Sequence, residues 1–151
     1  MLTLWPFSRR IRHRTFGDLR PARNGQFWRA RVPLAPAGRP VEVHISGADG
    51  PTEAQEKLYL QLTAHLPKVL KVALNAVHRE YHRVTAAQPQ LKWPRVSAPQ
   101  DLLRLVPLHG IWLDDGNGHK FVLSFQHKAD KDQEFHVFFK NWKLESVSAE
   151  R

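Results

Sequence analysis

The sequence predicts an α+β fold, in which an antiparallel sheet packs on one long, proline-kinked helix, with a short second helix. Three observations lead to this prediction. Segments that alternate apolar and polar residues, as half-buried strands do, occur near both ends of the 151-residue chain. Between them, apolar residues recur every three or four positions, as on one face of a helix. Strands, a helix and further strands in this order favour a sheet with the helix on one face.

The N-terminal strands are expected in three segments. TFGDL is short and is followed by the turn signal RPARNG. QFWRARVPL alternates imperfectly, whereas VEVHIS alternates cleanly and places Val41, Val43 and Ile45 on one face. PAGRP lies between these last two segments and is typical of a turn, so they are expected to form a hairpin.

The long helix is predicted over residues 52–84. Pro51 suits its start, and Glu53 and Glu56 suit the positive end of the helix dipole. Pro67 interrupts the pattern, but the apolar stripe stays in phase across it, which indicates either a kink or a very tight break. The residues of the stripe are Leu58, Leu62, Leu66, Val69, Ala73, Val77, Tyr81 and Val84.

The C-terminal part is expected to be an antiparallel meander after a proline-rich connection and the short helix SAPQDLLRLV. LHGIWL and HKFVLSF flank DDGNG and predict a hairpin. EFHVFFK and KLESVS follow as the last two strands. Phe135, Val137 and Phe139 share one face, which we expect to pack on the helix, while Phe138 lies on the other. The alternative is that the aromatic and basic residues here form a stacking platform for single-stranded nucleic acid.

Composition narrows the classes of protein that fit. The absence of cysteine excludes disulfides, thiolate zinc sites and cysteine nucleophiles, and it fits a cytoplasmic location. No run of about 18 apolar residues occurs, so no transmembrane segment is expected. At the N-terminus, apolar residues precede basic ones, which is the reverse of a secretory signal.

The formal net charge of +9 is concentrated near the N-terminus. Residues 1–39 contain nine arginines and one acid, Asp18, whereas residues 40–151 contain 14 basic and 13 acidic residues. We therefore expect residues 1–14 to be a flexible basic arm and residues 15–151 to be a single α+β domain. The arm would contact nucleic acid or another anion weakly, or would serve only as a solvated tail. Its candidate contact residues are Arg9, Arg10, Arg12 and Arg14.

No set of residues suggests catalysis or a cofactor. His78 and His82 are one helical turn apart and could hold zinc, but Arg79 replaces the glutamate of the metalloprotease motif, and we expect no metal site. Asp114 and Asp115 precede a turn that favours aspartate. Ser124 and Ser148 are not in a nucleophile-elbow motif. We therefore expect a protein that is not an enzyme and needs no cofactor.

Several motifs together resemble those of a known family. They are TFGDL, FWRARV followed by VEVHISG, GPTEAQ, SAPQDL and FHVFFKNWKLESVS, in this order from Phe16 to Ser148. The chain resembles a group of small bacterial domains of unknown function, some of which are described as immunity-like proteins of polymorphic toxin systems. The resemblance implies one small α+β domain with no established activity and supplies no catalytic residues. The arginine-rich N-terminus departs from the family pattern.

These observations favour a non-enzymatic bacterial domain that binds a protein partner, as an immunity or accessory protein recognising a toxin or another protein. The alternative is a nucleic-acid-associated protein that uses the arginines of the N-terminal arm. The sequence identifies neither the partner nor the oligomeric state, and it does not locate the binding surface.

Overall fold

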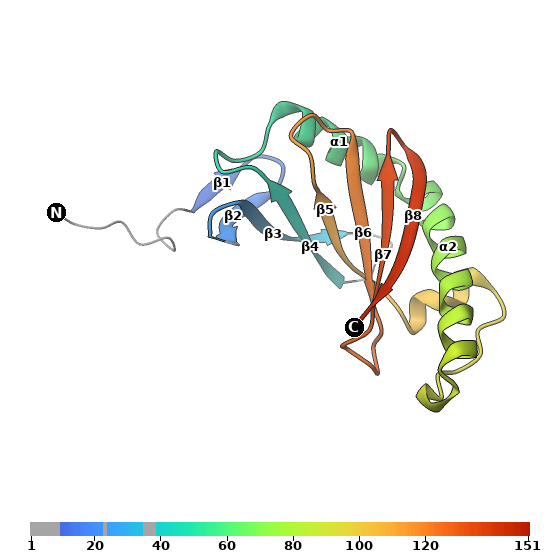
Figure 1. Ribbon diagram of the computed structural model, residues 1–151. Helices are drawn as coiled ribbons and strands as arrows, with labels where there is room; N and C mark the ends of the chain where they lie inside the picture. Colours follow the sequence, from blue (N-terminus) through green and yellow to red (C-terminus); the bar gives the residue numbers. More distant parts are fainter. Residues whose placement is uncertain (1–9, 23, 35–38) are drawn as a thin grey trace.

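Eight strands form one sheet in which the spatial order follows the chain order. The computed structural model describes residues 10–22, 24–34 and 39–151. Neighbouring strands are antiparallel except β4 and β5, which are parallel. The sheet therefore has two four-stranded antiparallel halves joined at its centre (Figure 1). Its strands are β1 (Ile11–His13), β2 (Gly17–Ala22), β3 (Phe27–Leu34), β4 (Arg39–Ser46), β5 (Leu108–Leu113), β6 (Lys120–Gln126), β7 (Glu134–Lys140) and β8 (Lys143–Glu150).

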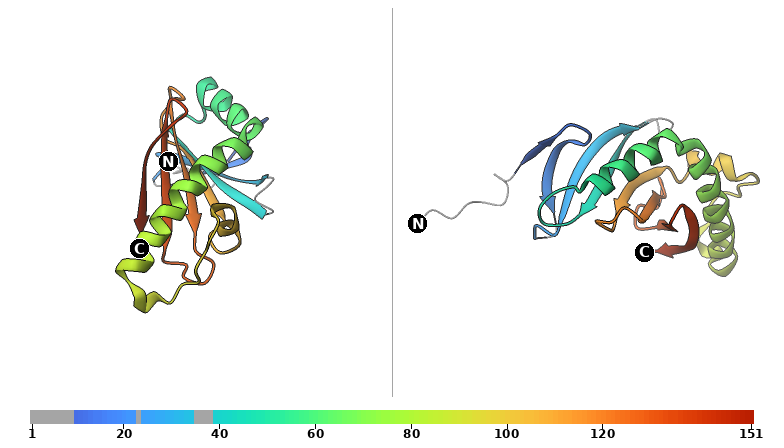
Figure 2. Two further views of the ribbon diagram at one scale, coloured as in Figure 1. Left: turned by 90° about the vertical axis from the view of Figure 1, so that its right-hand side faces the viewer. Right: turned by 90° about the horizontal axis from the view of Figure 1, so that it is seen from above.

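The helices all belong to the connection between β4 and β5. Two parallel strands need such a crossover, because the chain must return to the end of the sheet where it started. The described helices lie on one side of the sheet, and α2 runs along the half formed by β5 to β8 (Figures 1 and 2). They are α1 (Glu53–Ala64), α2 (Leu66–Ala87) and the 3-10 helices η2 (Pro89–Leu91) and η3 (Pro99–Arg104).

The predicted long helix is two helices separated by one residue, which is the tight break rather than the kink. Thr52 caps α1 in a reciprocal capping box with Gln55. His65 ends α1 and directly precedes α2. Pro67 then stands in the first turn of α2, where its missing N–H costs no hydrogen bond.

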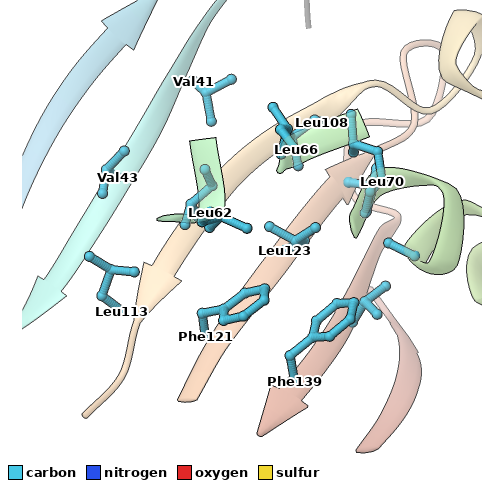
Figure 3. Packing of buried hydrophobic residues seen from close by; sticks show 14 of the residues in the cluster. Val41, Val43, Leu62, Leu66, Leu70, Leu108, Leu113, Phe121, Leu123 and Phe139 are labelled. Atoms are coloured by element: carbon cyan, nitrogen blue, oxygen red, sulfur yellow. The ribbon is translucent and has the colours of Figure 1, made fainter. Parts of the chain in front are cut away.

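The core lies between the helices and the inner face of the sheet. Figure 3 shows Leu62, Leu66 and Leu70 of the helices among side chains of the central strands. The predicted stripe is confirmed, except that Val69 is only partly buried and the neighbouring Leu70 is buried instead. The strand residues in this view are Val41, Val43, Leu108, Leu113, Phe121, Leu123 and Phe139.

The aromatic residues of β7 divide between the two faces as the alternation predicts. Phe135, Val137 and Phe139 are almost completely buried in the core. They pack with the helix layer, so they are core residues and offer no exposed ring for a nucleic-acid base. Phe138 points to the opposite face and is only half-buried.

The ordered sheet begins within the segment that we expected to be a flexible arm. Arg9 and the residues before it lie outside the described residues. Ile11–His13 form β1, which pairs with β2, and Arg14 forms an ion pair with Glu56 of α1. The folded domain therefore includes at least residues 11–14. The hairpin of β3 and β4 is confirmed by their register, although residues 35–38 lie outside the described residues.

None of the helices among the described residues combines the length and the apolar character needed to cross a bilayer.

Candidate functional site

The outer face of the sheet, which points away from the helices, carries a continuous row of side chains. Cross-strand pairing places one residue from each of five neighbouring strands in line. Since successive strand residues alternate between faces, these residues lie opposite the core positions of the same strands. From β3 to β7 the row is Arg29, His44, Trp112, Val122 and Phe138.

An aromatic cluster of Phe27, His44 and Trp112 occupies the middle of the outer face. The rings of His44 and Trp112 stack with centroids 3.9 Å apart and an interplanar angle of 7°. Phe27 meets Trp112 edge-on at 5.6 Å. All three side chains are half-buried, so they form a firm, partly apolar surface. One face of the Trp112 ring is thus already covered by His44.

A pocket opens beside this cluster where β2 and β3 diverge. The two strands pair only from Arg20 to Ala22 of β2 and from Phe27 to Arg29 of β3, while the first residues of β2 pair with β1. The pocket has a volume of about 560 Å³. It is lined by Phe16, Gly17, Asp18, Arg20, Arg29, Ala30, Arg31 and Glu42.

Three exposed arginines, Arg20, Arg29 and Arg31, surround this pocket, and we call them the arginine fork. Within the described part of the chain, none of them forms an ion pair. The two acids of the pocket have other partners: Asp18 lies 3.5 Å from Arg12, and Glu42 lies 3.4 Å from His44. The fork is therefore a cationic site whose guanidinium groups remain available to an anionic ligand.

Three of the four predicted contact residues of the arm lie among the described residues. Arg9 lies outside the described residues, and Arg10 is exposed. Arg12 faces Asp18, and Arg14 donates two hydrogen bonds to Glu56. Arg12 and Arg14 are thus engaged within the domain, unlike the arginines of the fork.

Glu56 is the anchor for the start of the fold. Its carboxylate accepts hydrogen bonds from Arg14 and from the hydroxyl of Thr15. The hydrogen bonds from Arg14, followed by the one from Thr15, lower the pKa of Glu56 to about 2. This carboxylate stays ionised, and its role is to fix the turn between β1 and β2 on the helix.

A second row on the outer face brings Ser124, His136 and Ser148 side by side on β6, β7 and β8. Both serine hydroxyls are buried and have no hydrogen-bond partner among the described residues. The two ring nitrogens of His136 face Glu134 at 3.3 Å and Glu150 at 3.1 Å instead. Histidine therefore does not activate either serine, and these residues do not form a nucleophile–base–orienter set.

The other residues considered from the sequence have local roles. The side chain of Asp115 accepts a hydrogen bond from the backbone N–H of Asn117 at 2.6 Å, which stabilises the turn between β5 and β6. His78 and His82 do share a face of α2, and both approach the backbone carbonyl of Val96. No group of three or more His, Cys, Asp or Glu side chains that could hold a metal occurs among the described residues.

The arginine fork and the aromatic cluster were not predicted as a site. The segment FWRARV, whose alternation we described as imperfect, does carry a signal. In β3, Phe27, Arg29 and Arg31 alternate with buried residues and so share one face. The positions of Arg20 and Trp112 beside them depend on strand pairing, which this local pattern does not determine.

The fold and this surface define an α+β domain whose outer sheet face carries free arginines beside aromatic side chains. The family described as Domain of unknown function (DUF6985) matches residues 15–150, and the chain belongs to this family. The match supports the family of unknown function that the sequence motifs indicated. Searches of the curated proteins and of the solved structures found no match to the chain.

Proposed function

We propose that this chain is a non-enzymatic binding domain that recognises an acidic segment of a protein partner. The observation that carries the proposal is the arginine fork, with three exposed guanidinium groups around a pocket of about 560 Å³ and no ion pair among the described residues. Arginine presents a planar array of donors that matches a carboxylate in a bidentate manner. Aspartate and glutamate side chains of a partner are therefore the expected ligands.

The backbone of the fork supports an extended ligand. From Ala30 to Leu34, β3 pairs with β4 on one side and has no strand partner on the other among the described residues. Such an edge can accept a peptide as an additional strand, in which main-chain hydrogen bonds give affinity and side chains give specificity. Acidic residues of that peptide would lie near Arg29 and Arg31, and its apolar residues near the aromatic cluster.

A protein partner fits this surface better than nucleic acid does. Most phenylalanines of the C-terminal strands are in the core, and the exposed area of Trp112 is reduced by its stacking on His44. A single-stranded nucleic acid needs aromatic faces on which successive bases stack. The ion pairs of Arg12 and Arg14 also reduce the charge that is free to bind phosphates.

The proposal extends to the biological setting that the sequence motifs indicated. We propose an immunity or accessory protein of the bacterial cytoplasm, whose partner is a toxin or a related protein. An immunity protein acts by occupying its toxin and therefore needs a recognition surface and no catalytic residues. The fork and the aromatic cluster supply such a surface.

The test is neutralisation of a toxin-like protein encoded by the neighbouring gene. The two proteins would be co-produced, and growth and complex formation would be measured with the unaltered chain and with the double variant Arg29→Glu/Arg31→Glu. We expect the charge reversal to abolish complex formation, because like charges would then face the acidic segment. Lys71→Glu/Arg79→Glu is the matched control, because both residues are exposed on α2, away from the fork, and their reversal changes the charge by the same amount, so binding should stay intact.

Two results would count against the proposal. One is a complex that forms equally well with the charge-reversed fork. The other is loss of binding in the Lys71→Glu/Arg79→Glu control as well, which would show an effect of net charge rather than of this site. Circular dichroism spectra of each variant would verify that the fold is kept.

A further inference from the structure

Two histidines of α2 and one backbone carbonyl meet at a single point. The Nε2 atoms of His78 and His82 are 3.0 Å apart. Each also approaches the carbonyl oxygen of Val96, His78 at 2.7 Å and His82 at 2.9 Å. Val96 belongs to the connection that runs from the end of α2 to η3. The three atoms therefore form a nearly equilateral triangle between the last turns of α2 and this connection.

Protons on the two imidazoles cannot make all three contacts attractive. The contacts with Val96 require a hydrogen on both Nε2 atoms, because a carbonyl oxygen only accepts hydrogen bonds. The contact between His78 and His82 requires a hydrogen on only one of them. If both Nε2 atoms carry a hydrogen, the two hydrogens face each other between His78 and His82. If only one does, the bare Nε2 of the other histidine faces a lone pair of the Val96 oxygen. Hydrogen bonding alone thus leaves this arrangement frustrated.

A metal ion removes this conflict, because all three atoms then direct a lone pair at the same positive charge. Donor atoms about 2.0 to 2.1 Å from one ion and at right angles to each other, as around an octahedral or tetragonal ion, lie about 2.9 Å apart. The three distances in the triangle are close to this value. We propose that His78 Nε2, His82 Nε2 and the carbonyl oxygen of Val96 form one face of a binding site for a divalent transition-metal ion.

The chemistry of the donors selects the kind of ion. Imidazole nitrogens favour zinc, copper and nickel, whereas magnesium and calcium favour sites built from oxygen. His78 and His82 are both half-buried and not fully enclosed, so water can reach the remaining coordination positions. An ion with three protein ligands and open positions exchanges more readily than one in a closed four-ligand site.

Such an ion would fasten the proline-containing connection to α2. The connection is already held there by the Tyr81 hydroxyl, which donates to the carbonyl of Pro94 at 2.5 Å. The fold does not depend on the ion, because Leu70, Leu74 and other buried side chains hold α2 in the core. The spacing of the two histidines along α2 indicates only two ligands. The third ligand, the carbonyl oxygen of Val96, lies beside them because the chain returns to α2.

The experiment uses the full chain without an affinity tag, with Zn²⁺ as the probe and Mg²⁺ as the comparison. We expect one equivalent of Zn²⁺ to bind and to raise the thermal midpoint, because a ligand that binds only the folded state stabilises it. Mg²⁺ should have no effect. His78→Gln and His82→Gln should each weaken Zn²⁺ binding at least about 10-fold, since even the loss of an outer partner of a metal ligand costs about 10- to 100-fold.

The exposed His119 provides a matched control, and His119→Gln should bind Zn²⁺ like the unaltered chain. For each variant, the thermal midpoint with Zn²⁺ is compared with the midpoint of the same variant without Zn²⁺. This comparison is needed because loss of a hydrogen bond to Val96 would lower stability even without Zn²⁺. Zn²⁺ binding that is absent from the unaltered chain would overturn the proposal. Binding that persists at full strength in the double variant His78→Gln/His82→Gln would do the same and would assign the ion to other residues.

Discussion

The guanidinium of Arg14 holds the carboxylate of Glu56 through two hydrogen bonds, of 3.0 Å from Nε and 2.7 Å from a terminal nitrogen. These residues are 42 positions apart in the chain. The pair joins the turn between β1 and β2 to the first turns of α1, and its two parallel bonds fix direction as well as distance. The N-terminal strand is thereby attached to the helix layer as well as to its neighbour β2.

This pair predicts how stability changes in acid. The pKa of Glu56 is lowered from 4.5 to about 2 in the folded protein, chiefly by Arg14. The unfolded chain therefore takes up this proton first, so the contribution to stability is complete above about pH 4.5 and is lost as the pH falls toward 2. Denaturant unfolding at a series of pH values measures the slope of the unfolding free energy against pH. In Glu56→Gln this slope should be smaller by the equivalent of up to about one bound proton.

Arg14→Gln provides the companion measurement for the acid limb. It should remove most of the same dependence, because Arg14 is the largest cause of the lowered pKa of Glu56. If both variants keep the acid limb of the unaltered protein, the two residues are not paired in solution.

Burial of Leu66 predicts a large loss of stability on truncation. Leu66 begins α2 and is fully buried in the core. Leu66→Ala should lower the free energy of unfolding by about 2–5 kcal/mol, because it removes buried methyl groups and leaves a cavity. Leu60→Ala is the matched control, since Leu60 is 52% exposed on α1 and its truncation should change stability by no more than about 0.5 kcal/mol. Equal midpoints for the two variants in urea would disprove this placement of the core.

The glycines of the turns predict a graded series of effects. Gly118 has a φ of +72°, and a Cβ atom on it would lie 2.7 Å from the carbonyl oxygen of Ala54 in α1. Gly25 has a φ of +81° but open space around it, whereas Gly116 has neither strain nor a close contact. Alanine at Gly116 should change stability by less than about 0.5 kcal/mol, and alanine at Gly25 should cost about 1–2 kcal/mol. Gly118→Ala should lower stability more than either, because the strained backbone and the close contact with Ala54 both destabilise the folded protein.

Thermal melting of these three variants gives the order directly. A midpoint for Gly118→Ala equal to that of Gly25→Ala would mean that the turn between β5 and β6 does not pack against α1. The series therefore tests a contact between the hairpin and the helix layer, and the control at Gly116 lies in the same turn.

Local patterns predicted the elements of this fold, because each depends on residues close in sequence. The stripe from Leu58 to Val84 and the alternation in β4 and β7 are of this kind, and the structure confirms them. The parallel pairing of β4 with β5 depends on how a crossover of some 60 residues packs, which no local pattern specifies. The arginine fork arises where β2 leaves β3, and this too is set by the register of distant segments.

The basic N-terminal residues predict weak, salt-dependent binding to nucleic acid. Arg9 and Arg10 precede β1, whereas Arg12 and Arg14 are in ion pairs with Asp18 and Glu56. We expect the full chain to bind mixed DNA or RNA only at low salt and without sequence preference, because its contacts would be to phosphates. Arg9→Gln/Arg10→Gln should weaken this binding and reduce the slope of log affinity against log salt by about two.

Deletion of residues 1–10 is the corresponding truncation, because it keeps β1 and the pair of Arg14 with Glu56. Removal of residues 1–14 would take away both and would confuse loss of binding with loss of structure. Titrations at two salt concentrations would compare the truncated chain with the unaltered one and with the fork variant Arg29→Glu/Arg31→Glu. If the truncated chain binds nucleic acid tightly, selectively and despite high salt, and the fork variant does not, then the outer face itself reads nucleic acid. The proposal of an acidic protein partner would then have to be abandoned, since the same arginines would be bound to phosphates.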